Sequence, residues 1–451
     1  MKKLIEKIQN IWKVEELRKR ILLTLFLTLI YRLGSFVIIP GVNYNQLTAY
    51  NESSGSNVLT DLLSLFSGGS FSNASIMALG IMPYISASII MQLLGVSVPS
   101  VQKMQKDGES GRKKINNYTR ILTIAICAVQ APAYLSMWVA SRNALPTGDA
   151  LNSLWWIQSV VVLVAGAMFA VWLGERITDK GVGNGISILI TVGIMSQLPG
   201  SLLAEIGVNS DNLIKVVLEL AAFVLIIMVT ILIVQGVRKI PINVAKRIVS
   251  SRSENVAQQG SRSYLPIKVN AAGVMPIIFA QAIVTIPMML VSNSATESPS
   301  WFQTAFTDIY GVWYNILLGL LIIIFTYFYT AITINPTDMS DDLKKNGGFI
   351  PGVKPGSETT EYIDSLISRI TLPGSIFLAI IAVIPAIVHS AVGITSGFEQ
   401  FFGGTSLLIM VAVVIDTLQQ IESYLLNRHM DGLVDNTRSR KRFSRKSSLN
   451  S

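Results

Sequence analysis

The chain has 451 residues, of which 51% are hydrophobic and only 14% are charged, and its formal net charge at pH 7 is +9. Soluble domains carry about 25% charged residues, so this composition excludes an ordinary soluble domain and favours a protein that lies largely in a membrane. The single cysteine, Cys127, excludes a framework of disulfide bonds within the chain and is expected to be a structural thiol.

About ten apolar segments are candidates for membrane-spanning helices. Crossing roughly 30 Å of hydrocarbon takes about 20 mostly apolar residues in a helix. In chain order the segments centre on residues 21–39, 75–96, 118–139, 154–173, 186–198, 213–234, 271–291, 312–334, 375–392 and 405–425, of which the fifth is short. The first segment ends in Ile39-Pro40-Gly41 without a small-x-small cleavage pattern, so we expect a retained span rather than a cleavable signal.

The basic residues are distributed unevenly among the segments between these spans. If both ends of the chain lie on one side, nearly all of the 36 Lys and Arg residues fall on that side, and the exceptions are Arg32, Arg142 and Lys215. Positive loops mark the cytoplasmic side, so this bias predicts cytoplasmic termini and an even number of spans. Membrane topology therefore accounts for most of the net charge, and nucleic-acid binding is not needed to explain it.

Two short segments in opposite halves of the chain nearly repeat each other. Gly-Ile-Met-Pro-Tyr-Ile at residues 80–85 and Gly-Val-Met-Pro-Ile-Ile at residues 273–278 both lie near the start of the second span of a five-span half. An odd number of spans per half gives an inverted repeat, with a substrate path between the halves. Because proline inside a helix removes a backbone hydrogen bond, we expect Pro83 and Pro276 to weaken and bend these helices. The alternative is coincidence, since glycine and proline are common in membrane helices.

The segment between the first two spans is unusual. Residues 44–56 are polar, and residues 58–66 have apolar positions at helical spacing, but the predicted helix is far too short to cross a membrane. Ser67-Gly68-Gly69-Ser70 ends this helix. Two interpretations remain equally favoured: a helix on the membrane surface, or a re-entrant helix in a cavity surrounded by protein.

Several segments on the cytoplasmic side stand out. Gly181-Val182-Gly183-Asn184-Gly185 is rich in glycine but follows no strand, so it is expected to shape a turn and the start of the fifth helix rather than to bind phosphate. The loops at 236–269 and 335–370 are too long to be simple turns, and we expect them to be docking surfaces for a soluble partner. The basic tail at 437–451 is expected to be disordered or to face lipid.

The sequence offers little that would support catalysis or ion coupling. The two histidines, His389 and His429, are too few for a metal cluster without other ligands. The sequence contains neither a Walker loop nor a Gly-x-Ser-x-Gly motif. Within the spans we count Arg32, expected to reach towards the membrane surface, and Asp416, which lies with Glu422 near the inner end of the last helix. This is fewer charges than a proton-coupled pump is expected to show.

Many long motifs, in the same order, make the chain similar to the SecY family, the central subunits of bacterial protein-conducting channels. The resemblance covers essentially the whole chain. Its motifs are Arg-Leu-Gly-Ser-Phe at 32–36, Leu-Phe-Ser-Gly-Gly at 65–69, the segment 78–90, Gly-Glu-Ser-Gly-Arg at 108–112, Trp-Leu-Gly-Glu at 172–175, Gly-Asn-Gly-Ile-Ser at 183–187, Leu-Pro-Ile-Lys-Val-Asn at 265–270, Phe-Tyr-Thr at 328–330, Asn-Pro at 335–336, Gly-Val-Lys-Pro-Gly at 352–356 and the segment 403–409.

The resemblance implies an all-α polytopic membrane protein of about ten transmembrane helices, in two inverted five-helix halves around an hourglass pore. Residues 1–20 would be a cytoplasmic N-terminal segment, 21–200 the first half with a plug near 58–70, 211–425 the second half, and 426–451 a cytoplasmic basic tail. A ring of aliphatic side chains would form the constriction. Matching the motifs places this ring at Ile81, Ile85, Ile186, Ile190, Ile278 and Ile409.

The resemblance also implies a plug and a lateral gate. The short helix corresponds to the plug, which favours the re-entrant interpretation, with Asp61, Leu62, Leu65, Phe66, Gly68 and Gly69 as plug residues. The second and seventh helices would form the two sides of the gate. Pro83, Gln92, Asn270 and Pro276 are the expected gate residues, and a Gln92–Asn270 hydrogen bond between helices would contribute about 0.6–2 kcal/mol.

The two long cytoplasmic loops would be docked by a ribosome and by a SecA-like motor ATPase, through Lys246, Arg247 and Lys354. Lys354 stands where an arginine is common in the family, so it keeps the charge but loses bidentate geometry. The region 250–259 carries a short insertion relative to the family, so individual loop contacts are expected to differ. SecE- and SecG-like small membrane subunits are the other implied partners.

The expected function is therefore a signal-gated channel in the bacterial cytoplasmic (inner) membrane. It would translocate unfolded secretory polypeptides and release transmembrane segments laterally into the lipid bilayer. No cofactor, metal site or covalent chemistry is expected, and the energy would come from a ribosome or an ATP-driven motor. The alternatives are a secondary transporter of a small solute, which inverted repeats alone would allow, and a membrane-embedded enzyme, for which the chain lacks a catalytic set.

Overall fold

A computed structural model describes residues 14–47, 67–140, 153–210, 212–244, 262–292, 310–392 and 398–447, together with Trp12, Ser64 and Ala144. Helices make up most of these residues. The chain divides into two units, one formed by residues 1–199 and 413–451 and the other by residues 200–412. The assignment of halves, plug and tail expected from the sequence stays a prediction.

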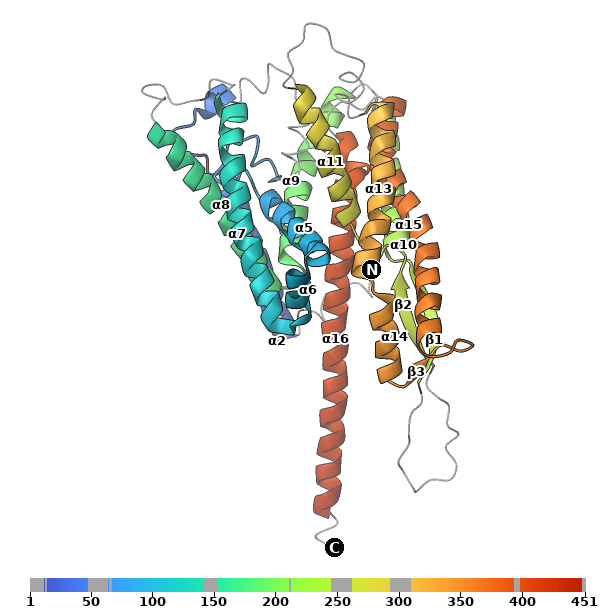
Figure 1. The fold of residues 1–451 in the computed structure, drawn as a ribbon. Helices are drawn as coiled ribbons and strands as arrows, with labels where there is room; N and C mark the ends of the chain where they lie inside the picture. The colour runs from blue at the N-terminus through green and yellow to red at the C-terminus, as the bar shows by residue number, and fades with distance from the viewer. Residues whose placement is uncertain are drawn as a thin grey trace. The chain divides into compact units, whose positions relative to one another are not determined.

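The first unit contains the N-terminal helices. Its elements are α2 (Glu15–Gly34), α5 (Met82–Ser97), α6 (Pro99–Lys106), α7 (Gly108–Tyr134), the π-helix η1 (Leu135–Ala140), α8 (Ser153–Lys180), most of α9 (Gly185–Val208) and the C-terminal part of α16 (Gly404–Ser447). Helix α7 packs against α5 and α8, and α2 packs against α8 (Figure 1).

The second unit combines helices with a small sheet. Its elements are α10 (Leu213–Val234), β1 (Val237–Val244), β2 (Arg262–Lys268), α11 (Met275–Ser292), α13 (Val312–Thr333), α14 (Pro336–Lys345), β3 (Gly348–Phe349), α15 (Ser357–Val392), the 3₁₀-helix η2 (Phe398–Phe401) and the start of α16. Helix α13 lies between α11 and α15 and contacts both.

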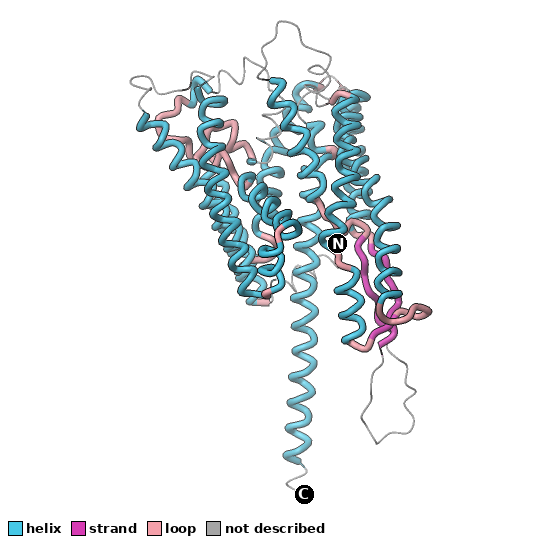
Figure 2. The backbone as a smooth tube through the Cα atoms, viewed as in Figure 1, coloured by secondary structure: helices cyan, strands magenta, loops and turns pink. Residues whose placement is uncertain are grey.

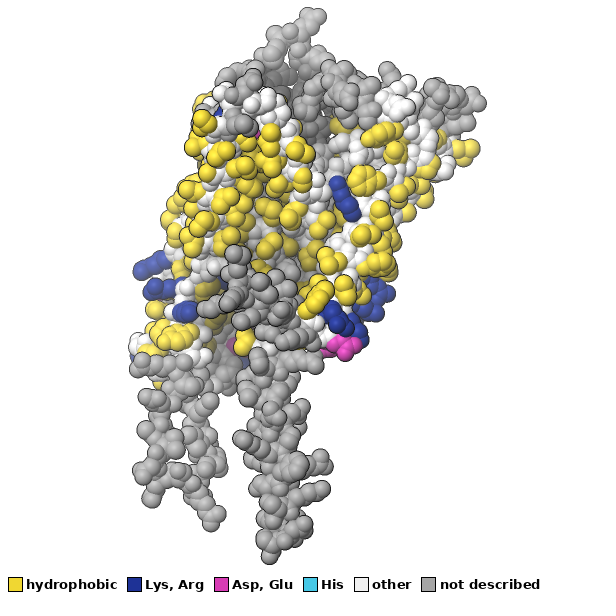
Figure 3. All heavy atoms as spheres, turned by 180° about the vertical axis from the view of Figure 1, so that it is seen from behind, with side chains coloured by type: hydrophobic (Ala, Val, Ile, Leu, Met, Phe, Trp, Pro, Cys, Tyr) yellow, Lys and Arg dark blue, Asp and Glu magenta, His cyan; other side chains and the backbone are white. Residues whose placement is uncertain are grey.

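Seven helices of the described residues are long and apolar enough to span a membrane, or eight if α5 and α6, bent by 103° relative to each other, count as one span. The seven are α7, α8, α9, α10, α13, α15 and α16; together with α2, α5 and α11 they match the ten expected spans in order. Large apolar side chains point outward, as at Ile214, which is 87% exposed, and on the face in Figure 3 they cover the helices of each unit. Such exposure suits contact with lipid.

The two Gly-x-Met-Pro segments adopt the same local structure. Gly80 and Gly273 have φ values of +55° and +65°, and each precedes a helix that begins at the methionine. In both, the carbonyl of the residue before the methionine accepts hydrogen bonds from the first two backbone N–H groups after the proline. The prolines lie in the first helical turn, where an N–H has no partner to lose. The expectation that Pro83 and Pro276 weaken or bend these helices is therefore wrong.

The second expected span, 75–96, is helical only from Met82. The residues before it pair with the end of the first span instead: Ile39 N–H donates to the Ala74 carbonyl at 2.9 Å, and Ile76 N–H donates to the Val37 carbonyl at 2.8 Å. This short antiparallel bridge satisfies backbone groups that a helix would otherwise pair internally.

The two long loops contain a three-stranded antiparallel sheet in the order β2-β1-β3, drawn in magenta in Figure 2. Along β1, Ile240 and Ile242 are buried and Pro241 between them is exposed, which is the period of two expected of a half-buried strand. Ile240 and Ile267 of the sheet share an apolar cluster with Ile363 and Ile367 of α15. The sheet, which the sequence analysis did not anticipate, rests on this cluster.

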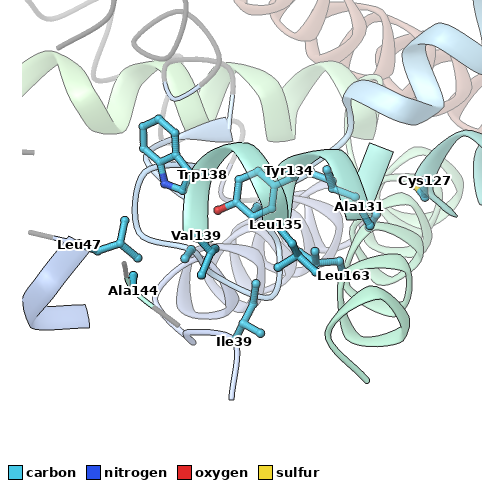
Figure 4. Close-up of a cluster of buried hydrophobic side chains, with 14 residues drawn as sticks. Ile39, Leu47, Cys127, Ala131, Tyr134, Leu135, Trp138, Val139, Ala144 and Leu163 are labelled. Atoms are coloured by element: carbon cyan, nitrogen blue, oxygen red, sulfur yellow. The ribbon is translucent and has the colours of Figure 1, made fainter. Parts of the chain in front are cut away.

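The core of the first unit lies where α7, η1 and α8 meet the chain around residue 39. Tyr134, Leu135 and Trp138 pack there with Leu163 and Ile39 (Figure 4). Cys127 belongs to the same cluster and is fully buried, as expected of a structural thiol. The cluster fixes the end of α7 close to residues 71–79, which also line it and lead into α5.

Candidate functional site

Polar side chains of the first unit hold the chain at residues 64–69. The Arg32 guanidinium of α2 donates from Nη1 to the Gly68 carbonyl at 2.5 Å, and Gln197 of α9 donates from Nε2 to the Ser64 carbonyl at 2.8 Å. The Gly69 N–H donates to the same Ser64 carbonyl, also at 2.8 Å. Two helices distant in sequence therefore supply the donors for this segment. Arg32, which we expected to reach towards the membrane surface, binds a buried backbone carbonyl of this segment.

Gly68 fits this position for two reasons. Its φ of +65° lies in the left-handed region, which side-chain-bearing residues rarely adopt. A Cβ atom there would also lie only 2.8 Å from the Cα atom of Gly193 on α9. The backbone of the segment therefore lies directly against the backbone of α9.

Aromatic side chains hold the residues that follow. The Phe71 ring lies 4.8 Å from the ring of Tyr134 and 4.9 Å from that of Trp138. The Tyr134 hydroxyl donates to the Phe71 carbonyl at 2.7 Å, and the Trp138 Nε1–H donates to the Ser72 carbonyl at 3.4 Å. The end of α7 and η1 thus satisfy backbone groups that would otherwise be buried without partners.

We call Ser64 together with residues 67–72 the anchored segment. Of the expected plug residues, Gly68 and Gly69 belong to it. The expected plug residues Asp61, Leu62, Leu65 and Phe66 lie outside the described residues. The sequence did not reveal Gln197, Tyr134 or Trp138 as contacts of this segment, because each is brought to it by tertiary packing.

The expected ring residues are divided between the two units. Ile81 and Ile190 are buried, Ile85 and Ile186 are half-buried, and all four belong to the first unit. Ile278 is half-buried and Ile409 is buried, and both belong to the second unit. The ring that would combine them stays a prediction.

Ile186 has a packing role that the sequence did not show. It lies beside Gly174 of α8, where an added Cβ would be 2.8 Å from Cγ1 of Ile186. Gly185 lies equally close to α8, since its Cβ would be 2.0 Å from the Gly174 carbonyl oxygen. The start of α9 therefore crosses α8 at two glycines, and this contact fixes the position of Ile186.

The two polar gate residues have different surroundings. Gln92 of α5 donates from Nε2 to the Ser88 hydroxyl of the same helix at 3.4 Å. The Asn270 side-chain oxygen is buried, and no donor of the described residues reaches it. The two residues belong to different units, so their expected hydrogen bond stays a prediction.

At three positions of the glycine-rich turn at 181–185, the backbone N–H already donates a hydrogen bond to a side chain and is therefore not available to bind a phosphate. Val182 N–H donates to the Thr24 hydroxyl at 3.1 Å, Gly183 N–H to the Gln420 side-chain oxygen at 2.9 Å, and Gly185 N–H to the Thr178 hydroxyl at 2.9 Å. The expectation that these glycines shape a turn and a helix start is confirmed.

The expected docking residues are only partly described. Lys354 is exposed, and its ammonium lies 3.4 Å from a carboxylate oxygen of Glu358. Lys246 and Arg247 lie outside the described residues.

The spans contain more charged residues than Arg32 and Asp416, the two that the sequence predicted. Glu219 lies inside the span 213–234 and is 3% exposed, and Glu205 near the end of α9 is 1% exposed. Arg120 of α7 also donates two hydrogen bonds to the Glu175 carboxylate of α8, at 2.9 and 2.6 Å. Glu219 could have been found from the sequence, because it interrupts a strongly apolar run.

These features define a multi-pass helical membrane protein whose two units each begin one helix at a Gly-x-Met-Pro step. In one unit, polar and aromatic side chains also hold the anchored segment against three helices. The chain belongs to the SecY family, whose family model matches residues 75–418.

Curated relatives cover nearly the whole chain. It is 36% identical to the protein translocase subunit SecY of Chlamydia trachomatis serovar D, over 96% of this chain and 99% of that protein. It is 38% identical to the subunit of the same name from Streptomyces scabiei, over 94% and 98% of the two chains. For Thermotoga maritima the identity is 37%, over 94% and 97%.

Solved channel structures share the fold. One described as a protein-conducting channel is 16% identical, with a TM-score of 0.63 over 90% of this chain and 92% of that chain. Sec61 in the canine ribosome–channel complex from the endoplasmic reticulum is also 16% identical, with a TM-score of 0.54 over the same shares.

Proposed function

We propose that this protein is the channel-forming subunit of a translocase in the bacterial cytoplasmic membrane. It moves unfolded secretory polypeptides outward and releases apolar segments sideways into lipid. The observation that carries the proposal is the near-complete coverage of, and 36–38% identity to, proteins named translocase subunit SecY. The comparisons give no support to the alternative, a secondary transporter of a small solute.

The pore constriction is assigned to Ile81, Ile85, Ile186, Ile190, Ile278 and Ile409. A narrow apolar constriction excludes water and thereby blocks ions. Aliphatic side chains also form no hydrogen bonds with a passing chain, so a polypeptide of any sequence slides through. All six residues are isoleucines, whose aliphatic side chains suit such a constriction.

The lateral gate is assigned to α5 and α11, with Pro83, Gln92, Asn270 and Pro276. The prolines act here as helix starts, so the gate helices are expected to move as stiff rods. A Gln92–Asn270 hydrogen bond of about 0.6–2 kcal/mol would be weak enough for an inserting signal sequence to break. The Asn270 side-chain oxygen is buried and has no donor among the residues that the structure describes, which supports a hydrogen-bond partner such as Gln92 for it.

The partners are assigned from the family. They are SecE- and SecG-like small membrane subunits, a SecA-like motor ATPase and the ribosome, the last two docking through Lys246, Arg247 and Lys354 in the cytoplasmic loops. Both termini lie in the cytoplasm. The subunit needs no cofactor and catalyses no covalent chemistry, and its partners supply the energy.

Site-specific photocrosslinking tests the proposal. A photoreactive residue replaces Ile278 or Ile409, and a secretory chain is stalled midway through the membrane. A crosslink that requires a functional signal sequence is expected at both positions. The matched control is Ile316 of α13, which is 57% exposed on an apolar helix face and should crosslink to lipid instead.

If neither position gave a crosslink while the stalled chain was demonstrably held in the channel, the assignment of Ile278 and Ile409 to the ring would be contradicted. Silence together with uptake of a small solute by vesicles containing the purified protein would favour a transporter.

A further inference from the structure

The glycine-rich turn at 181–185 is held by three helices of the first unit. Its backbone N–H groups donate to the hydroxyl of Thr24 on α2, the hydroxyl of Thr178 on α8 and the side-chain oxygen of Gln420 on α16, at 3.1, 2.9 and 2.9 Å. We call the turn together with these three side chains the α9 joint, because α9 begins at its end. Neither the proposed pore, the gate nor the docking loops account for it.

The glycines of the α9 joint lie against the same three helices. An added Cβ atom would overlap atoms of α2 at Gly181 and of α8 at Gly185. At Gly183 it would lie 3.0 Å from the Thr417 hydroxyl of α16. A backbone that is hydrogen-bonded and closely packed on three sides cannot shift without losing one of these contacts, so the joint fixes where α9 begins.

One face of α9 carries every contact that the channel proposal uses on this helix. At about 100° per residue, spacings of four, three and four residues keep the four positions within an arc of about 60°. The first two are assigned to the pore constriction, and the last two contact the anchored segment. In order, these residues are Ile186, Ile190, Gly193 and Gln197.

A small tilt at the joint is enough to disturb the far end of this face. Because α9 rises about 1.5 Å per residue, Gln197 lies about 18 Å along the helix axis from Gly185. A tilt of about 5° at Gly185 displaces Gln197 by about 1.6 Å over that length. The hydrogen bond from Gln197 to the Ser64 carbonyl is 2.8 Å long, and lengthening it by this amount breaks it.

We propose that the α9 joint positions this face of α9, and that Gln420 is a positioning residue for the seal of the closed channel. When the hydrogen bond between Gly183 and Gln420 is lost, the start of α9 is free to tilt away from α16. Ile190 and the anchored segment then lose their fixed positions together. The inference rests on the proposed function, which assigns Ile190 to the constriction.

Thiol labelling of the resting, full-length protein in lipid vesicles tests the joint. Ile190 is 8% exposed, so the thiol introduced by Ile190→Cys should react slowly with a water-soluble maleimide. Adding Gln420→Leu should speed this reaction by roughly 2- to 12-fold, the effect of losing one hydrogen bond on a local opening equilibrium. Gln420→Glu keeps an acceptor oxygen for the Gly183 N–H and should restore the slow rate.

Two controls separate positioning from general destabilisation. The natural thiol of Cys127 is fully buried in the cluster around α7, and its labelling, resolved by mass spectrometry in the same sample, should not change. Gln419 is exposed on α16 like Gln420 but points about 100° away around the helix. Gln419→Leu should therefore leave the labelling rate at position 190 unchanged.

Ion efflux from vesicles that contain the resting protein tests the connection to the seal. Gln420→Leu should increase the efflux, and Gln420→Glu should not. Since Gln420 and Gln197 act on the same face of α9, the variant with both Gln420→Leu and Gln197→Leu should leak less than the sum of the two single variants.

The contrary outcomes are specific. An unchanged labelling rate in Gln420→Leu, or an equal rise at Cys127, would overturn the proposal, as would a Gln420→Glu variant that reacts as fast as Gln420→Leu. Should Gln420→Leu fail to fold, Thr24→Val breaks the α2 side of the joint, and Thr24→Ser is its conservative partner. The labelling needs no secretory chain, so its failure leaves the crosslinking test of the proposed function unaffected.

Discussion

At Gly68, backbone conformation and packing both exclude a side chain. Alanine in the left-handed region costs about 1–2 kcal/mol. Its Cβ would also meet the Gly193 backbone at 2.8 Å, and such overpacking typically costs about 1–3 kcal/mol more. Gly68→Ala is therefore expected to lower the thermal midpoint of the protein. The matched control is Gly108→Ala, since Gly108 has a φ of +67° but no atom within 4 Å of an added Cβ. Equal losses in the two variants would contradict the close packing on α9.

Gln197 acts on the same segment through one hydrogen bond. Gln197→Leu keeps the side-chain size but leaves the Ser64 carbonyl with one donor fewer, at a cost of about 0.5–1.5 kcal/mol. If the anchored segment belongs to the plug, the closed channel should leak more small ions than the wild type. Ion efflux from vesicles that contain the resting protein measures this leak. Gln102→Leu, on the exposed surface of α6, should leave the efflux unchanged. If ion efflux does not increase in the Gln197→Leu variant, the anchored segment does not help to seal the closed channel.

At the scale of elements, the two Met-Pro helix starts make a clear prediction. Because Pro83 and Pro276 occupy first-turn positions, Pro83→Ala and Pro276→Ala are expected to change the free energy of unfolding by no more than about 0.5 kcal/mol. Thermal unfolding measures this change. An effect of several kcal/mol, or a shift in signal-sequence gating, would show that the prolines act through helix bending after all.

The same elements show what the sequence could and could not predict. Apolar runs of about 20 residues were enough to place the spans, because lipid selects on length and composition alone. The role of Pro83 was misread because it depends on a helix boundary, which periodicity places poorly. The strand β1 alternates as a strand should, but the pattern is short and lies among basic residues. The donors at Gln197 and Arg32 come from packing between distant helices, which no local pattern encodes.

At the scale of the whole molecule, one charged residue, Lys354, is expected to take part in docking the motor ATPase that supplies the energy for export. Lys354→Glu reverses the charge of an exposed residue in the proposed docking loop. Motor-driven export should fall well before growth or membrane insertion is affected, as measured with a secreted reporter. Lys113→Glu is the matched control, because Lys113 also is exposed and pairs with a glutamate one turn away. Normal export by the Lys354→Glu variant would show that Lys354 is not part of the docking site.

The turn at 181–185 has a consequence for the order in which the protein matures during synthesis. Its Gly183 N–H is satisfied by Gln420, and α2 contacts the same late helix through the Arg20–Tyr424 hydrogen bond of 3.0 Å. Residues 413–451 belong to the first unit, yet the ribosome makes them after the second unit, residues 200–412. The N-terminal helices therefore lack these two hydrogen bonds until the ribosome has made the entire second unit. A nascent chain that stops before residue 413 should remain sensitive to quality-control proteases, however well its earlier helices have inserted.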